Sequence, residues 1–249
     1  MAQDLRVAWN APPRAPSIHT MLGALTVLLA LPLARQAAAE ERVDRYIGVA
    51  RSPSGEQLYR EEHEMVEREG KPVRSRTVYY DPQNKVIGHS ECQYPLSPYA
   101  PNYRFSDLRT GWRESARVDG KVLVLSNGRE QRRLDAANGQ TLVIGQGLHY
   151  FVRQHLDKLA RRQVTVRYAV PPKLDTYLFR LRPLDSPRRG VIRLRLEIDN
   201  WLLRLLAPEL EVDYEVATRR LLRYRGVSNL EDADGAMPQV VIHYSYPAF

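Results

Sequence analysis

The sequence predicts a mainly β (α+β) protein, built as a curved antiparallel sheet or incomplete barrel wrapped around one long amphipathic helix. Three observations predict it. Apolar and polar residues alternate through most of the chain beyond Val43, turn-forming pairs interrupt the alternation, and one segment alone has helical periodicity. A one-sided sheet must bury its apolar face, and that helix is the only long element available to cover it.

The composition is that of an ordinary globular protein. The 249 residues are 43% hydrophobic and 27% charged, with 8% aromatic residues and one cysteine. Beyond the first forty residues no apolar run approaches the roughly 20 residues that span a bilayer, which excludes a multi-pass membrane protein. One cysteine excludes a disulfide scaffold and a cysteine-rich zinc site.

Residues 1–39 have the pattern of a secretory signal peptide. An uncharged apolar run at 21–34 is followed by small residues in an Ala-x-Ala arrangement that ends at Ala39. We expect cleavage after Ala39, a periplasmic location and one β-rich domain over 40–249. A retained anchor helix is the alternative interpretation.

The chain is basic, with a formal net charge of +8. Removal of residues 1–39 takes away three arginines and one aspartate, which leaves a net charge of +6. An exported chain is not expected to bind nucleic acid. The arginines either pair with the interspersed acids in solvent or contact anionic lipid head groups, so peripheral membrane contact is an open expectation.

The first half of the chain predicts an antiparallel meander of short strands. Its turn signals include Asp119-Gly120, Asn127-Gly128 and Asn138-Gly139, pairs that favour tight hairpins. A loop over 93–103 interrupts the meander, because it spaces three prolines three residues apart. Its tyrosines, at 94, 99 and 103, either pack on the sheet edge or grip a sugar or an acyl chain.

Two segments of the second half alternate cleanly. In 191–199 the even positions are apolar and Arg193 and Arg195 are odd, while in 209–216 the even positions are apolar and the odd ones are acidic. Each strand should have one wet and one dry face. If the two strands are antiparallel neighbours, the arginines lie near the acidic stripe and help to fix the register.

One segment has the helical period. Its apolar stripe is made by six residues at helical spacing: Leu148, Phe151, Val152, His155, Leu156 and Leu159. This spacing predicts the single long helix. On that stripe a buried His155 imidazole needs a hydrogen-bond partner, either within the core or on a ligand.

No motif in the sequence indicates catalysis, a metal or a cofactor. The glycine-rich phosphate loop, the nucleophile elbow and the metal-binding histidine pair are all missing from it. Cys92 has no neighbouring base to activate it. The sequence therefore predicts a protein that is not an enzyme, and a hydrolase whose residues converge only in three dimensions is the least favoured alternative.

The connection between the two alternating strands is unusually apolar. Residues 201–206 contain Trp201, Leu202 and Leu205 among four leucines and one tryptophan, whereas connections are normally polar. The segment either plugs the open end of the sheet as a short helix or presents an apolar patch to a partner or a membrane. Both interpretations place it at the mouth of the sheet.

Several stretches resemble an uncharacterised family of exported bacterial β-rich proteins. The resemblance is carried by the helix, the proline turn and Tyr-x-Phe-Arg strand after it, and both ends of the chain beyond residue 39: residues 147–159, 170–172, 177–180, 46–48, 58–63 and 222–229. Leu148 and Leu156 stand where that family has Phe and Trp. The family implies no activity. More distantly, the architecture is similar to periplasmic lipoprotein carriers of the half-barrel type, which implies lipid binding.

These observations lead to one principal functional hypothesis, non-enzymatic binding of an apolar or acyl-bearing ligand in the cell envelope. The expected ligand-binding residues line a pocket between sheet and helix, or its mouth: Phe151, His155, Leu156, Trp201, Leu202 and Leu205. The alternative is an envelope structural module that binds a protein partner. A cavity filled by the protein's own side chains would count against the first hypothesis.

Overall fold

The computed structural model describes residues 41–200, 210–232 and 234–247. The predicted signal peptide with its cleavage site lies outside the described residues, and so do Trp201, Leu202 and Leu205.

Within those ranges the chain forms fifteen strands, one α-helix and a short 3-10 helix. The strands are β1 (Glu41–Arg51), β2 (Gln57–Arg68), β3 (Lys71–Tyr80), β4 (Val86–Gln93), β5 (Asn102–Asp107), β6 (Arg113–Asp119), β7 (Val122–Ser126), β8 (Gln131–Asp135), β9 (Leu142–Val143), β10 (Val164–Val170), β11 (Asp175–Leu184), β12 (Val191–Ile198), β13 (Leu210–Glu215), β14 (Leu221–Val227) and β15 (Gln239–Ser245). The helices are α1 (Gly147–Leu159) and η1 (Pro171–Lys173).

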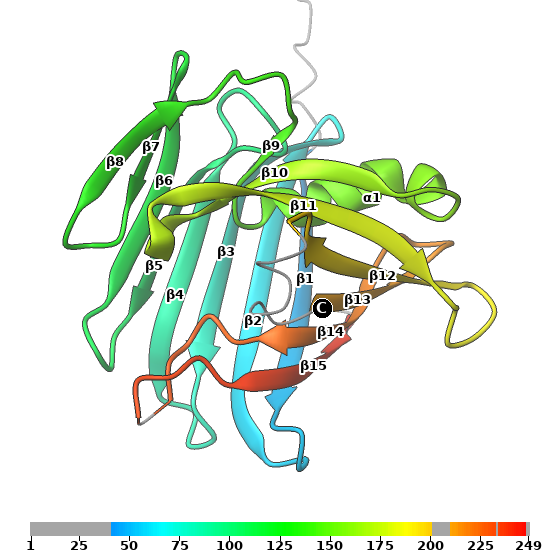
Figure 1. The fold of residues 1–249 in the computed structure, drawn as a ribbon. Coiled ribbons are helices and arrows are strands. Elements are labelled where there is room, and N and C mark those ends of the chain that lie inside the picture. The colour runs from blue at the N-terminus through cyan, green and yellow to red at the C-terminus, as the bar shows by residue number, and fades with distance from the viewer. Residues whose placement is uncertain (1–40, 201–209, 233, 248–249) are drawn as a thin grey trace, which may run out of the picture. The chain divides into compact units, whose positions relative to one another are not determined.

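All of these strands belong to one curved sheet (Figure 1), with the order β8-β7-β6-β5-β4-β3-β2-β1-β15-β14-β13-β12-β11-β10-β9. Strand β1 therefore lies in the middle of the sheet and pairs with both β2 and β15. The mainly β class is confirmed, and so is the antiparallel meander, because β1 to β8 are neighbours in chain order. Among the described strands, only β9 and β10 pair in parallel, since α1 connects them as a crossover.

Two of the three predicted glycine hairpins form. Gly120 and Gly128 have positive φ angles of 59° and 83° and turn β6 into β7 and β7 into β8. The prediction for Asn138-Gly139 was wrong. Gly139 also has a positive φ, 81°, but the strands on either side of it, β8 and β9, are the opposite end strands of the sheet.

The predicted register of the two alternating strands is confirmed. In the β12 and β13 pair, Arg193 lies opposite Asp213 and Arg195 opposite Glu211. Arg193 donates two hydrogen bonds to Asp213, at 2.7 and 2.8 Å. Arg223 of β14 donates to the same carboxylate, and although burial raises the pKa of Asp213, these arginines outweigh it and hold the pKa below its usual value.

The outer face of these strands is drier than predicted. Asp213 is only 5% exposed and Glu211 and Glu197 are also buried, although alternation assigned the acids of β12 and β13 to the wet side. The reason is that neighbouring arginines from β11, β12 and β14 lie over the carboxylates and pair with them. The predicted wet face is in fact a layer of ion pairs.

The predicted helix is confirmed as α1. Gly147 opens it at a point where a Cβ atom would lie 1.9 Å from the Tyr99 backbone oxygen, so no larger residue fits there. The helix packs its apolar residues against β10 to β14 in one core cluster: Phe151, Val152, Leu156 and Leu159 with Val166, Leu181, Leu194, Leu196, Val212, Tyr214 and Leu221. It also contacts the first half of the sheet, through Tyr150 on Tyr94 and an Arg153–Glu67 ion pair of 2.8 Å.

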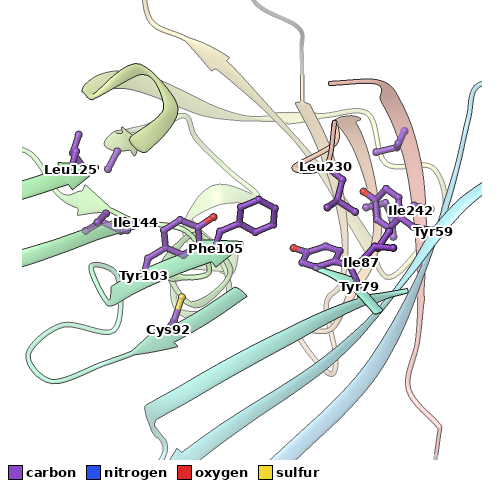
Figure 2. Close-up of a cluster of buried hydrophobic side chains, with 14 of the residues drawn as sticks. Tyr59, Tyr79, Ile87, Cys92, Tyr103, Phe105, Leu125, Ile144, Leu230 and Ile242 are labelled. Carbon is purple, nitrogen blue, oxygen red and sulfur yellow. The ribbon is translucent and has the colours of Figure 1, made fainter. Parts of the chain in front are cut away.

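A second core cluster is built mostly from the first half of the sheet, with Leu230 and Ile242 from the last part of the chain (Figure 2). Tyr79 and Ile87 lie near Leu230, while Tyr103 and Phe105 extend the cluster toward Ile144. The two clusters share partly buried Tyr224 and Tyr244, so the apolar interior continues from one half of the sheet to the other.

The two ends of the sheet approach each other without strand pairing. Arg167 of β10 donates from its guanidinium to the backbone oxygens of Asp135 and Ala136, at 2.7 and 2.5 Å, where β8 ends. Arg132 of β8 forms a 3.1 Å ion pair with Asp175 of β11. We call this junction the seam. Among the described residues, no helix is long and apolar enough to cross a membrane.

Candidate functional site

A cavity of about 290 Å³ lies at the seam. Its walls come from the β4–β5 loop, the β6–β7 hairpin and the connection from β8 into β9, and they are mostly apolar: Pro95, Leu96, Ser97, Tyr99, Ala100, Asn102, Val118, Gly120, Ala136, Ala137, Thr141 and Leu142. Figure 1 shows that β8 and β9, the strands nearest this connection, lie in different parts of the sheet. The cavity therefore forms only because the sheet curves until its ends meet.

The β4–β5 loop is held in place at several points. Ser97 Oγ accepts the backbone N–H groups of Tyr99 and Ala100 at 3.2 and 3.3 Å, a local turn of the kind that serine stabilises. The Tyr99 carbonyl accepts the N–H of Ile144 at 2.9 Å, just before α1 begins. The loop is thus fastened to the start of the helix segment.

Tyr99 connects the seam cavity to two of the predicted ligand-binding residues. Its ring lines the cavity and packs edge-on against Phe151 and His155, with centroid distances of 5.3 and 5.8 Å. Phe151 and His155 are themselves stacked at 4.5 Å. The Tyr99 hydroxyl donates to the Gln154 side chain, so the tyrosine is held along one flank of α1.

The structure places the predicted residues behind this wall rather than in it. Phe151 is 2% exposed and Leu156 is fully buried, and both belong to the core cluster of α1. Neither residue lines the seam cavity. Trp201, Leu202 and Leu205 cannot be placed, because they lie outside the described residues. The assignment of all these residues to a ligand site stays a prediction.

As its place on the apolar stripe predicts, His155 has a buried ring nitrogen in need of a hydrogen-bond partner. Its Nδ1 atom is buried and has no hydrogen-bond partner in the described part of the chain. Burial lowers the pKa of His155, and the charge of Lys158 lowers it further. The ring is therefore a neutral imidazole near neutral pH, packed between Phe151 and Tyr99.

Sequence reasoning missed most of the cavity lining. The alanines, Thr141 and Leu142 come from segments with no pattern of their own, and only the proline and tyrosine loop and the Asp119-Gly120 hairpin stood out. Of the two interpretations of that loop, packing holds for Tyr94 and Tyr103, which belong to the core. Tyr99 does both, because it packs on the helix and also lines the cavity.

Glu61, His63 and Thr77 form a carboxylate–imidazole–hydroxyl series, the arrangement that activates the nucleophile in many hydrolases. His63 Nε2 lies 2.5 Å from Glu61 Oε2, and His63 Nδ1 lies 2.9 Å from the hydroxyl of Thr77. All three are buried, and Tyr46 stacks on the His63 ring at 4.3 Å. None of the three lines the seam cavity, so a substrate there would not reach the Thr77 hydroxyl.

Neither a metal centre nor a reactive thiol emerges from the described residues. Among them, no group of three or more His, Cys, Asp or Glu side chains could hold a metal ion. Burial raises the pKa of the Cys92 thiol to about 11, despite hydrogen bonds that lower it. The thiol is therefore protonated at neutral pH and is a poor nucleophile.

Comparisons with known proteins identify no family. No family model matches the sequence, and no curated protein matches it. One solved structure, described as a beta-barrel-like protein of a domain of unknown function (DUF1849) from Brucella abortus, is 8% identical, with 85% of this chain and 99% of that chain covered and a TM-score of 0.49. A similarity this low supports no conclusion about function, and the resemblance to exported bacterial proteins stays a prediction.

Proposed function

We propose that this protein binds a small apolar or acyl-bearing ligand in the seam cavity and catalyses no reaction on it. The observation that carries the proposal is the 290 Å³ cavity with its predominantly apolar walls. Ligand pockets typically run from about 300 to 1,000 Å³, so this one suits a single chain or a compact molecule rather than a multi-chain lipid.

The walls provide both affinity and orientation. Each methylene group of a ligand that leaves water for such a cavity contributes about 0.8 kcal/mol. Ser97, Asn102 and Thr141 add the few polar groups that orient a ligand in an apolar pocket. Because the Ser97 oxygen already accepts two backbone N–H groups, its hydroxyl proton is the part available to a ligand.

The predicted residues enter this proposal through Tyr99. Phe151 and His155 support its ring, and Leu156 packs within the same helix-centred core. A shift of Tyr99 would join the cavity to the unpaired His155 Nδ1 atom, which gives a ligand a polar anchor next to the helix. The proposal keeps the predictions that the sheet encloses the helix and that Trp201, Leu202 and Leu205 belong to the mouth of the sheet. The site of action is the periplasmic side of the cell envelope.

The test is native mass spectrometry of the full chain, purified from bacteria without detergent, before and after incubation with envelope lipids. We expect a stoichiometric adduct that solvent extraction identifies as an acyl compound. Ala137→Trp should abolish it, because Ala137 lines the cavity and is exposed enough to carry an indole without disturbing the core.

Ala160→Trp is the matched control. Ala160 is also exposed, follows the end of α1, and does not line the cavity. An adduct that survives Ala137→Trp, or one that both substitutions remove equally, would contradict the proposal. A clean apo mass after incubation would also count against it.

An interaction module of the envelope is the second candidate. Leu96 favours it, because this side chain is 79% exposed at the rim of the cavity beside Pro95. Exposed apolar groups next to a concavity are typical of protein contacts. If no lipid binds, loss of a co-purifying envelope protein on Leu96→Asp would support this candidate instead.

A further inference from the structure

A second cavity, separate from the seam, is surrounded by arginines. It lies where the start of β1, the first turns of α1, the β13–β14 turn and the segment after β15 meet, and it is lined by Arg42, Asp44, Tyr46, Met65, His149, Arg153, Thr218, Arg219, Arg220 and Tyr246. Its volume of about 20 Å³ leaves room for one water-sized group. We call it the arginine cavity.

Three of its four arginines have a carboxylate partner. Arg42 pairs with Asp44 at 2.9 Å, Arg153 with Glu67 at 2.8 Å and Arg219 with Asp157 at 2.7 Å. These pairs cancel three of the four positive charges.

The fourth arginine is not neutralised. In the described part of the chain, no carboxylate lies within ion-pair distance of Arg220, and its guanidinium lies over the Tyr246 ring, 4.5 Å from the centroid. The arginine cavity therefore keeps one uncompensated positive charge next to a buried aromatic floor.

The cavity is built rather than accidental. Arg219 has a positive φ of 57°, a strained conformation for a residue with a side chain, and in it the guanidinium donates to the Arg153 carbonyl at 2.6 Å. Arg153 is held from the other side by Glu67. These hydrogen bonds hold Arg153 and Arg219 beside one small space that Arg220 also borders, and Arg219 keeps its strained backbone conformation there.

The floor of the cavity adds no charge of its own. His149 is buried and its Nδ1 atom lies 2.9 Å from the Tyr214 hydroxyl. Burial lowers the pKa of His149 to about 3, with a further contribution from the charge of Arg153. Tyr46 and Met65 form the rest of the buried floor. Asp44 is the carboxylate in the lining, and Arg42 pairs with it at 2.9 Å, so the positive charge that an anion meets comes from the other arginines.

We propose that the arginine cavity binds a phosphoryl oxyanion, with one oxygen in the small space and Arg153, Arg219 and Arg220 beside the others. Guanidinium groups bind oxyanions through charge-assisted hydrogen bonds. Three arginines that line one small cavity match the several oxygens of a phosphoryl group better than the two of a carboxylate. The site uses none of the seam cavity, so it stands or falls separately from the proposed function.

The experiment is isothermal titration of the full chain with inorganic phosphate at low ionic strength. We expect saturable binding near one equivalent, weakened at least tenfold by Arg220→Gln. Because Arg220 is exposed, this variant should fold normally, and its thermal unfolding checks that it does. Arg220→Lys keeps the charge without the guanidinium fork and should bind with intermediate affinity.

Arg117→Gln is the matched control, since it removes the same charge from an exposed pair with Asp119 on the distant β6–β7 hairpin. Equal weakening by both variants would overturn the proposal, because it would show only an effect of net charge.

A second arm floats the protein with phosphatidylglycerol vesicles and with phosphatidylcholine vesicles. Phosphate binding without flotation identifies free phosphate as the ligand. Flotation with the anionic vesicles that Arg220→Gln abolishes and Arg117→Gln does not identifies a lipid head group. Absence of both phosphate binding and Arg220-dependent flotation would overturn the proposal.

Discussion

The guanidinium of Arg167 donates a 2.7 Å hydrogen bond to the backbone oxygen of Asp135, and this contact links the two ends of the sheet, between which the described residues form no strand pairing. Arg167 is 4% exposed, and no ion pair is found for it among the described residues. Two hydrogen bonds from this side chain to backbone carbonyls thus connect the ends of the sheet where the described strands form no ladder. One of the carbonyls belongs to Ala136, which lines the seam cavity.

Replacement of Arg167 should open the seam. Arg167→Leu removes a buried charged donor and its two part-buried hydrogen bonds to backbone carbonyls, and we expect a loss of about 3 kcal/mol in the free energy of unfolding. Urea denaturation measures it. Arg117→Leu, on an exposed hairpin, should change stability by less than about 0.5 kcal/mol. Similar losses in both variants would show that the Arg167 contacts do not hold the ends of the sheet together.

The start of α1 should tolerate no side chain. Gly147→Ala places a Cβ atom 1.9 Å from the Tyr99 backbone oxygen, so the β4–β5 loop must move, and we expect a loss of about 3 kcal/mol or more. In Gly139→Ala the new Cβ meets open space, and only the positive φ of 81° is strained, which costs about 1 kcal/mol. Chemical denaturation of both variants should give this order, and the reverse order would contradict the described contact.

His149 should make the protein sensitive to acid. Its pKa is lowered to about 3 in the folded state, against about 6.5 when unfolded. Between these values the unfolded chain carries one more proton, so this contribution to stability is complete above about pH 6.5 and falls as the pH drops toward 3. The slope is about tenfold in the folding equilibrium per pH unit.

His149→Gln tests this, because glutamine does not titrate and its amide can also hydrogen-bond Tyr214. The free energy of unfolding of the unsubstituted protein should fall more steeply between pH 6 and pH 4 than that of the variant. Parallel curves would mean that His149 is protonated in the folded protein.

Cys92 should resist thiol reagents while the protein is folded. Burial raises the pKa of its thiol to about 11, and the side chain is almost fully buried. Reaction with Ellman's reagent at pH 8 should therefore be slow in buffer and rapid in concentrated urea. Fast labelling of the folded protein would place the thiol in a far more open environment than the core cluster of Figure 2.

The sequence by itself determined the elements whose signal is local. The apolar stripe that includes Phe151 and Leu156 predicted the helix, and the opposed charges of β12 and β13 predicted that Arg193 would meet Asp213. Such signals are readable because a helix or a strand pair requires a fixed spacing of side chains within a few residues.

Only the tertiary structure decided what depends on the curvature of the whole sheet. Asn138-Gly139 looks like a hairpin, yet it lies between strands at opposite ends of the sheet, because turn chemistry does not specify which strands become neighbours. The burial of Asp213 and the Arg167 contacts follow from arginines on other strands. The seam cavity, which Tyr99 shares with Ala137, exists only where segments distant in sequence meet, so no single stretch of the chain carries its pattern.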